Sequence, residues 1–177
     1  RRQRQMCIRD RVYIALKSVA RVKLDDRDFT PGWKFNEYEM KGVPVRIEIG
    51  PRDIENGVAT VARRDKTEEK FTIRLDDIAT ELPKLLADIQ ANMYNKALAF
   101  RDSHVKIVSD TAELKDAVDS GNFALGMWCG DRECEDKIKE ITGASTRNMP
   151  FDQTPCGDKC VCCGKKATKK IYFGKAY

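Results

Sequence analysis

Four cysteines in the last third of the chain have the spacing of a metal site. Four residues separate Cys129 from Cys134, two separate Cys160 from Cys163, and twenty-five lie between the pairs. Two close pairs of cysteines, each on a short turn and both binding one ion, are typical of a tetrahedral zinc site. Four thiolates would fill the coordination shell, whereas catalytic zinc keeps a position open for water. The spacing therefore predicts a structural zinc ion.

The neighbouring cysteines leave two alternatives open. Cys156 and Cys162 can substitute as ligands, although Cys160 and Cys162 would form a C-x-C pair, which is less usual for zinc. Cys160 to Cys163 also fits a C-x-x-C redox motif, but it lacks a thioredoxin-like βαβ setting and leaves the other pair unexplained. Most of the chain's seven cysteines cluster at metal-like spacing, which argues for a reducing compartment, and hence the cytoplasm.

A second group of residues has the chemistry of a site for single-stranded RNA. Phe35 offers a ring on which an unstacked base can lie, and Glu39, four residues later, shares its helical face. A carboxylate accepts hydrogen bonds from the N–H groups of guanine, and the forked donors of Arg46 fit guanine O6 and N7. Arg52 follows the next turn, within reach of a phosphate or a base. The set predicts recognition of unpaired guanines.

The same stretch has more ordinary interpretations. Trp33 and Tyr38 are further rings for stacking, but aromatic residues on a short helix are more often core residues. We expect Trp33 in particular to be buried. Arg46 and Glu48 also fit a solvated strand face. From these residues alone, the packed-core interpretation is favoured over the RNA interpretation.

The composition is typical of a globular protein but does not indicate a particular function. The chain has 177 residues, of which 41% are hydrophobic and 34% charged, enough for one or two domains with a core. It has no apolar run near the ~18 residues of a membrane span and no apolar signal-peptide region. The net charge of +5 permits a nucleic-acid partner but does not require one.

Hydrophobic periodicity and turn residues predict two alternating units. In the first, we expect a helix ending near residue 19, strands at 21–25 and 43–49, a helix at 33–41, a hairpin of 58–64 with 70–75, and a long helix at 78–103. In the second, we expect strands at 105–108, 123–129 and 170–173 and helices at 112–120 and 133–142. This alternation indicates α/β or α+β architecture.

Several stretches together resemble the prolyl-tRNA synthetase family, in its archaeal and eukaryote-like form. They are TPGWKFNEYEMKGVPVRIEIGPRD at 30–53, WCGDREC at 128–134, CVCCGK at 160–165 and the final KAY at 175–177. The resemblance covers nearly everything after residue 11. It implies an α/β fold with a mixed-sheet anticodon-binding domain at 12–95, truncated at its N-terminus, and an α+β zinc-binding domain at 96–177.

The resemblance also implies a function. By position, the family's base-contacting residues fall on Phe35, Glu39, Arg46 and Arg52. The family are class II enzymes that attach proline to tRNA(Pro) with ATP and Mg²⁺, which implies a cytoplasmic protein that is a homodimer when full length. Tyr177 is implied to lie near the catalytic site of the intact enzyme. The alternative is a non-enzymatic, anticodon-domain-like RNA-binding accessory protein with a structural zinc site.

The chain departs from the family pattern at its N-terminal side. The class II catalytic core is absent, so we expect no catalytic residues here and no activation of proline by this chain alone. Residues 1–11 resemble a translated sequencing adaptor, and we interpret them as a non-native leader in which Cys7 has no role. The first strand of the anticodon domain is missing, which we expect to leave a sheet edge or core face exposed and the first unit less stable.

Other polar residues are expected to be structural. We expect His104, the only histidine, to lie at a helix-to-strand junction, and the aspartates near residue 26 to lie in a solvated loop or to cap a helix. A basic run near the C-terminus is expected to be solvated, with contact to the tRNA backbone as a second possibility. These residues are Asp25, Asp26 and Asp28, and Lys165, Lys166, Lys169 and Lys170.

Overall fold

The structure is a computed structural model that describes residues 2–66 and 69–176. It divides into two units, Arg1–Lys96 and Ala97–Tyr177. The division falls inside helix α4 (Ile78–Ser103), which contributes to both units. The expected boundary between residues 95 and 96 concerns independently folding domains, so it stays a prediction. Tyr177, expected near a catalytic site, lies outside the described residues.

A three-stranded antiparallel sheet carries the first unit. Its strands are β1 (Val45–Glu48), β2 (Val58–Arg63) and β3 (Lys70–Arg74), in the order β1-β2-β3. Because side chains alternate between the faces of a strand, Ile47, Val61 and Ile73 share one face. That face packs against α4 and against helix α1 (Arg2–Lys17), which buries Val12 and Leu16.

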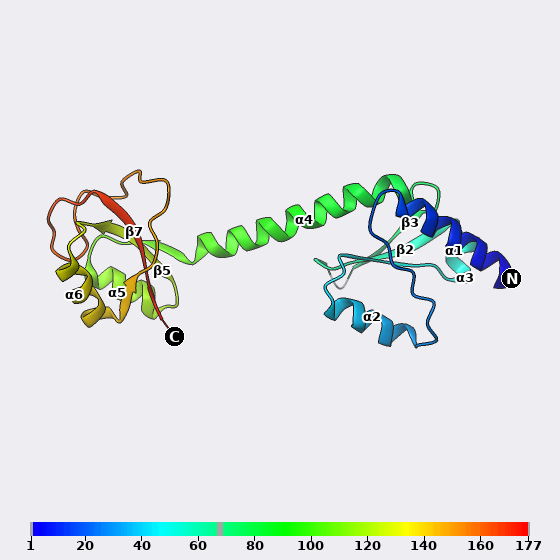
Figure 1. The fold of residues 1–177 in the computed structure, drawn as a ribbon, viewed down its shortest axis with the longest axis horizontal. Coiled ribbons are helices and arrows are strands. Elements are labelled where there is room, and N and C mark those ends of the chain that lie inside the picture. Colours follow the sequence, from blue (N-terminus) through cyan, green and yellow to red (C-terminus); the bar gives the residue numbers. More distant parts are fainter. Residues whose placement is uncertain (1, 67–68, 177) are drawn as a thin grey trace. The chain divides into compact units, whose positions relative to one another are not determined.

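Helix α2 (Pro31–Met40) is separated from α1 along the chain by an irregular segment (Figure 1). A strand was expected at residues 21–25, and this prediction is wrong. A strand needs a ladder partner, and in the described part of the chain β1 pairs with β2 alone. Side-chain contacts hold this segment instead: Arg27 donates to Asp25 at 2.9 and 2.7 Å and also pairs with Glu37 of α2.

One helix of the first unit was not expected. Helix α3 (Pro51–Glu55) begins where the Gly50–Pro51 pair was interpreted only as the end of a strand. Pro51 suits the first position of a helix, because that position has no intrahelical use for an N–H group. Asp53 secures the turn by accepting from the Gly50 amide at 2.8 Å and from the Thr60 hydroxyl at 3.1 Å.

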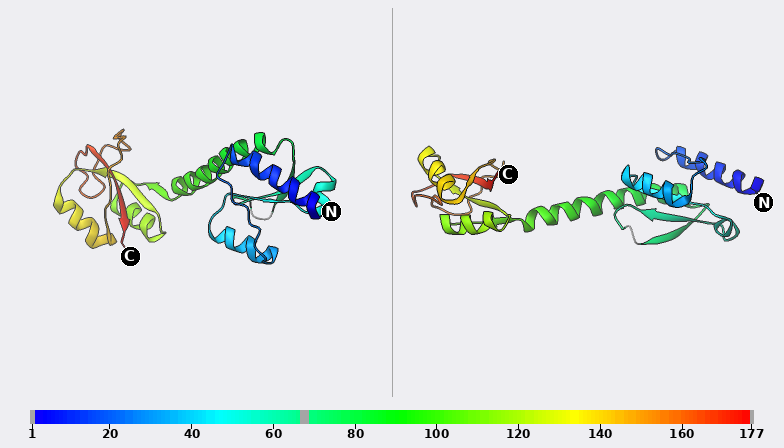
Figure 2. Two further views of the ribbon diagram at one scale, coloured as in Figure 1. Left: turned by 45° about the vertical axis from the view of Figure 1, so that its right-hand side comes forward. Right: turned by 90° about the horizontal axis from the view of Figure 1, so that it is seen from below.

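A four-stranded mixed sheet carries the second unit (Figure 2). Its strands β4 (Val105–Ile107), β5 (Phe123–Trp128), β6 (Ala144–Thr146) and β7 (Lys169–Lys175) follow the order β4-β5-β7-β6. Among the described strands of this sheet, only β4 and β5 pair in parallel. Strand β6 was not expected, because three residues are too few to show an alternation.

Two capped helices complete the second unit. Asp110 accepts from two amides at the start of α5 (Thr111–Asp119), and Asp131 accepts from one at the start of α6 (Arg132–Thr142). Leu114 and Ile138 from these helices lie with Phe173 of β7 in one core. The α/β fold class is therefore confirmed. A mixed sheet was expected in the first unit, but its described strands all pair antiparallel, because the short connections between them do not allow parallel pairing, and the mixed sheet lies in the second unit.

Helix α1 includes most of the segment that we interpreted as a leader. The helix is continuous through residue 11, but continuity does not distinguish a native from a foreign sequence, so the interpretation stays a prediction. Cys7 is exposed on this helix.

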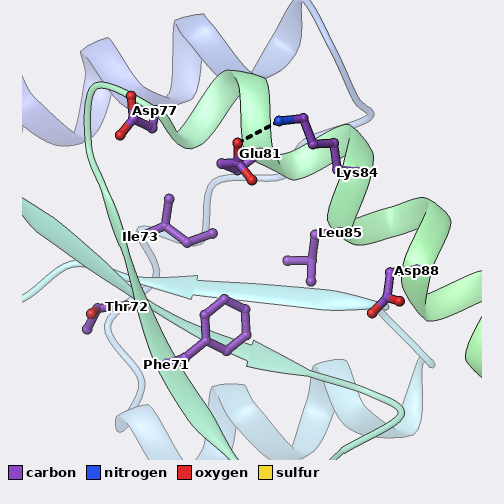
Figure 3. A pocket seen from close by; sticks show the side chains of 8 residues that line it. All are labelled: Phe71, Thr72, Ile73, Asp77, Glu81, Lys84, Leu85 and Asp88. Carbon is purple, nitrogen blue, oxygen red and sulfur yellow. Dashed lines mark hydrogen bonds and ion pairs between the residues drawn. The ribbon is translucent and has the colours of Figure 1, made fainter.

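A shallow pocket of about 460 Å³ lies between β3 and α4 (Figure 3). Phe71, Ile73 and Leu85 form its apolar part, and Glu81 pairs with Lys84 at its rim. It contains none of the expected site residues. Among the helices of the described residues, none has the length and apolar character to cross a membrane.

A buried ion pair holds the hairpin of the first unit against α4. Asp65, whose side chain is only 2% exposed, pairs with Arg63, and Arg63 also pairs with Asp88 of α4. Asn92 of α4 donates to Asp65 at 2.7 Å. The hydrogen bond from Arg63 lowers the pKa of Asp65 well below its ordinary range. The ion pair therefore stabilises the fold at every pH at which Asp65 is ionised.

Acidification should destabilise the first unit. Since the folded-state pKa of Asp65 lies below its unfolded value, its contribution is complete above the ordinary value of 3.8 and is lost as the pH falls below it. We expect thermal unfolding to show a midpoint that declines between about pH 5 and pH 2. Asp65→Asn should be less stable at neutral pH and lose less on acidification, whereas parallel acid profiles for both proteins would contradict the assignment.

Candidate nucleic-acid interface and metal centre

The polar face of the first sheet carries the predicted RNA residues. Arg46 pairs across the ladder with Ala62, and Glu48 with Thr60, so these residues point away from the face that packs on α4. Helix α2 ends at Met40, and Gly42 turns the chain back with a left-handed φ of 69°. This turn leads α2 directly into β1, which explains how helix and strand residues can meet.

Phe35, Glu39 and Arg46 are in contact. The Arg46 guanidinium lies 3.9 Å from the centroid of the Phe35 ring, and its Nη1 donates to Glu39 Oε1 at 2.8 Å. Its Nε donates to Glu48 Oε1 at 3.0 Å. Lys70 of β3 completes the group, 5.0 Å from the Phe35 ring and 2.9 Å from Glu48. Three elements, α2, β1 and β3, thus present one ring, two acids and two cations together.

The two carboxylates beside Arg46 favour its charged form and fix the position of its guanidinium. Its side chain is 18% exposed, and burial lowers its pKa, but the hydrogen bonds that it donates to Glu39 and Glu48 outweigh this and raise the pKa. Glu39 is 60% exposed, so its carboxylate is available to a ligand. A charged fork fixed against a ring, beside an accessible acceptor, is a preorganised arrangement for a planar polar ligand.

Arg52 is placed apart from the other three. It lies exposed on α3, and no hydrogen bond, ion pair or ring contact joins it to Phe35, Glu39 or Arg46 in the part of the chain that the structure describes. Its assigned role stays a prediction. Lys70 was missed by sequence reasoning, although the β2–β3 register, read outward from the hairpin turn, could have placed it on this face.

Trp33 is not a core residue, which corrects the expectation. It is 47% exposed and stacks on Phe29, with ring centroids 4.2 Å apart. Positions 33 and 35 lie about 200° apart around a helix, so only Phe35 faces the sheet. Tyr38 is half-buried, with Lys23 and Lys41 over its ring at 5.6 and 5.7 Å.

Of the three aspartates near residue 26, Asp26 and Asp28 are exposed and Asp25 has structural contacts. Asp25 pairs with Arg27 and, at 3.7 Å, with Lys34. The hydrogen bond from Arg27 lowers the pKa of Asp25 well below its ordinary range. This aspartate therefore anchors the loop before α2.

His104 lies at the end of α4. Its Nδ1 is 2.7 Å from the Phe100 carbonyl oxygen, and its ring packs on the Phe100 ring. It has the contacts of a helix-end residue, as expected.

The four predicted cysteines of the second unit meet at one point. The Sγ atoms of Cys129, Cys134, Cys160 and Cys163 all lie within 4.8 Å of one another, and two of the separations are 3.6 and 3.9 Å. Tetrahedral Zn–S bonds of about 2.3 Å would place sulfurs roughly 3.8 Å apart. The donor set and its spacing therefore fit a zinc ion.

Two tight turns bring the cysteines together. The first follows β5, where Gly130 has a φ of 88°, and leads into α6, which carries Cys134. The second is the knuckle around Cys160, closed by hydrogen bonds between the Cys160 amide and the Lys165 carbonyl at 2.8 Å and between the Gly164 amide and the Cys160 carbonyl at 2.9 Å. Gly164 takes a left-handed φ of 69°.

Burial and backbone amides act differently on the thiols. Burial raises the pKa of Cys134. Burial also opposes ionisation of Cys160, but hydrogen bonds from the backbone at Cys163 and Cys162 lower its pKa to about 7. The knuckle thus stabilises one thiolate by itself.

The remaining cysteines lie outside this set. Cys156 and Cys162 pack beside the cluster as half-buried side chains, without joining the four sulfurs that lie together. The cysteines that lie together are therefore Cys129, Cys134, Cys160 and Cys163. The identity of a bound metal, and the roles of all the site residues, stay predictions at this point.

Comparisons with known proteins identify the family to which both units are similar. Residues 2–85 match the family model described as an anticodon binding domain, and residues 111–177 match the model described as the C-terminal domain of prolyl-tRNA synthetase. A proline–tRNA ligase of Clostridium novyi is 50% identical over 163 residues, and proline–tRNA ligase 2 of Bacillus cereus is 48% identical. These alignments cover 92% of this chain and 34% of each relative, so the chain spans about a third of their length.

A solved structure gives the same relationship in three dimensions. The crystal structure of prolyl-tRNA synthetase from Cryptosporidium parvum, complexed with L-proline and AMP, has a TM-score of 0.90 and 35% sequence identity. It is matched over 98% of this chain and 37% of its own. The chain therefore belongs to the prolyl-tRNA synthetase family, of which it comprises the anticodon-binding and C-terminal domains.

Proposed function

We propose that the first unit binds the anticodon of a proline tRNA and reads its guanines through Glu39 and Arg46. The observation that carries this proposal is the contact of Arg46 with both the Phe35 ring and the Glu39 carboxylate, at 3.9 and 2.8 Å. The match of residues 2–85 to an anticodon-binding domain supports it. On this proposal the activity of the unit is binding, and the described site contains no catalytic group.

The chemistry of the site favours guanine over adenine. The Watson–Crick edge of guanine has two N–H donors, which suit an exposed carboxylate, next to the O6 acceptor, which suits a guanidinium. Adenine presents an unprotonated ring nitrogen at the position of the guanine N1–H, which would face the carboxylate without a shared proton. The Phe35 ring provides a stacking surface, worth about 1–3 kcal/mol per base in comparable sites.

Arg52 has a different part in this proposal. It lies exposed on α3, away from the Phe35 group. An exposed arginine suits a phosphate or a neighbouring nucleotide better than a guanine already held by Arg46. We assign it a role in orienting the RNA.

The whole protein is proposed to be a proline–tRNA ligase. The support is that the similar proteins, which are about three times as long as this chain, are proline–tRNA ligases. Such an enzyme takes proline, ATP and Mg²⁺ in a class II catalytic domain, and we propose a cytoplasmic homodimer. The chain described here supplies the recognition of tRNA.

The metal centre is proposed to hold structural zinc through Cys129, Cys134, Cys160 and Cys163. Their sulfur separations support a tetrahedral site, which leaves no position for a substrate or water. Zinc would secure the long irregular segment between β6 and β7. Binding energies of about 10–16 kcal/mol for zinc in small fingers show that one ion can organise a segment of this kind.

Binding to tRNA tests the anticodon site. We expect the chain to bind a proline tRNA more tightly than the same tRNA with its anticodon guanines replaced by adenines. Glu39→Gln should reduce this preference about tenfold, because one well-placed polar contact contributes roughly 1–3 kcal/mol to discrimination. Fluorescence anisotropy with both tRNAs gives the ratio of dissociation constants.

The control for this experiment is Glu55→Gln, which removes an exposed carboxylate from α3 and should leave the ratio unchanged. Arg46→Lys keeps the positive charge but loses the fork, so it should weaken discrimination as well. Equal affinity of the unaltered chain for both tRNAs would overturn the proposed reading of the anticodon.

Metal analysis tests the zinc site. After expression with sufficient zinc, we expect one zinc ion per chain. Cys134→Ser should lose the ion and lower the unfolding midpoint of the second unit, since metal binding contributes to folding. Cys162→Ser is the matched control and should keep one zinc. Substoichiometric zinc in the unaltered chain would refute the proposal, and loss of zinc from Cys162→Ser would refute the ligand assignment.

A further inference from the structure

Four exposed lysines border the cysteine site of the second unit. We refer to Lys159, Lys165, Lys166 and Lys169 as the knuckle lysines, because three flank the knuckle directly and the fourth begins the strand that follows. Lys170, which belongs to the same basic run, is different. It is buried and pairs with Asp152 at 3.3 Å, so it is not available to a partner.

The fold places two of these lysines against each other. Lys159 and Lys166 form an antiparallel bridge, which directs their side chains to the same side of the two backbone segments. Lys165 follows on the same turn, where its carbonyl accepts from the Cys160 amide. Like charges directly opposite each other destabilise a strand pair. This arrangement therefore has a local cost that a negatively charged partner would offset.

Lys169 extends the group along β7. Its Nζ lies 5.3 Å from the centroid of the Trp128 ring, which sits beside Cys129. The ammonium also lies close over Gly130, where a Cβ would be 2.8 Å from it. The lysine is thus held over the turn that carries the first cysteine pair.

Carboxylates do not balance these charges. Across the described residues, none of the knuckle lysines forms an ion pair with an acid, and between Cys156 and Lys170 the only acid is Asp158. A zinc ion with four thiolates carries two negative charges, so it would offset at most half of the group. An excess of positive charge remains on this exposed surface.

We propose that the knuckle lysines bind the phosphate backbone of RNA, an inference that rests on the proposed function as a tRNA-binding protein. Lysine is a compact, mobile point charge that suits phosphates rather than base edges. Binding at this surface releases counterions and depends on salt, not on sequence. It would therefore add affinity for any tRNA without adding preference for the proline anticodon.

The test compares two triple variants with the same loss of charge. One is Lys159→Gln, Lys165→Gln and Lys166→Gln, and the control is Lys106→Gln, Lys137→Gln and Lys139→Gln, three exposed lysines elsewhere in the second unit. Binding to the proline tRNA and its guanine-replaced counterpart is measured at several salt concentrations. We expect the knuckle variant to bind both tRNAs about tenfold or more weakly near 0.1 M salt, with a slope of log K against log salt that is shallower by about 2–3.

The outcomes separate this proposal from the anticodon proposal. A knuckle variant that weakens both tRNAs equally, with the ratio between them intact, supports the phosphate surface even if Glu39→Gln has no effect. An equal loss in the control would mean that only net charge matters and would overturn the proposal. Loss of zinc with unchanged RNA affinity would mean that the lysines serve the metal site, which also overturns it.

A second variant guards against misfolding of the triple variant. Lys165→Gln alters one exposed side chain on the turn, and zinc content and circular dichroism report whether it is folded. We expect it to retain zinc and to lower the salt slope by about 0.7–0.9. An unchanged slope in the folded, zinc-loaded single variant would contradict the proposal.

Discussion

The alternation of side chains along β1 is the constraint on which the first unit depends. Val45 and Ile47 must face α4, because that face of the sheet makes the hydrophobic core with Leu85 and Ile89. The residues between them are then directed to the opposite face, which places Arg46 and Glu48 beneath α2. A shift of one residue in register would exchange the faces and destroy core and candidate interface together. The binding surface is thus a consequence of the core.

The second unit contains both an apolar core and a separate cluster of cysteines, around which its long irregular segment packs. Leu114, Ile138 and Phe173 form a conventional core beneath the helices. The segment between β6 and β7 contains no helix or longer strand, and it packs around the cysteines and Met127. Thiolates that converge at metal distance can tie such a segment to the sheet where apolar side chains are too few. On the proposal of a zinc site, the second unit is stabilised by a metal as well as by its apolar core.

The departures from the sequence-based predictions have separate physical causes. Residues 21–25 alternate like a strand, but alternation describes one chain and a strand requires a partner. Tryptophan is a residue type that is often buried. However, the angle between positions 33 and 35 on a helix allows only one of these two side chains to face the sheet. Helix α3 is five residues long, too short to show a helical period. Long, strongly patterned elements such as α4 were predicted with their bounds.

The sequence by itself determined the fold class, most of the elements, the family resemblance and the two groups of candidate residues. Residue type, short spacing and periodicity are local properties, and each of these conclusions rests on them. Only the tertiary structure decided that Arg46 joins Phe35 and Glu39, that Lys70 belongs with them and Arg52 does not, and that Cys162 lies outside the four converging sulfurs. Contacts between residues distant in the chain depend on strand register and on how turns direct side chains, and no single segment of sequence contains that information.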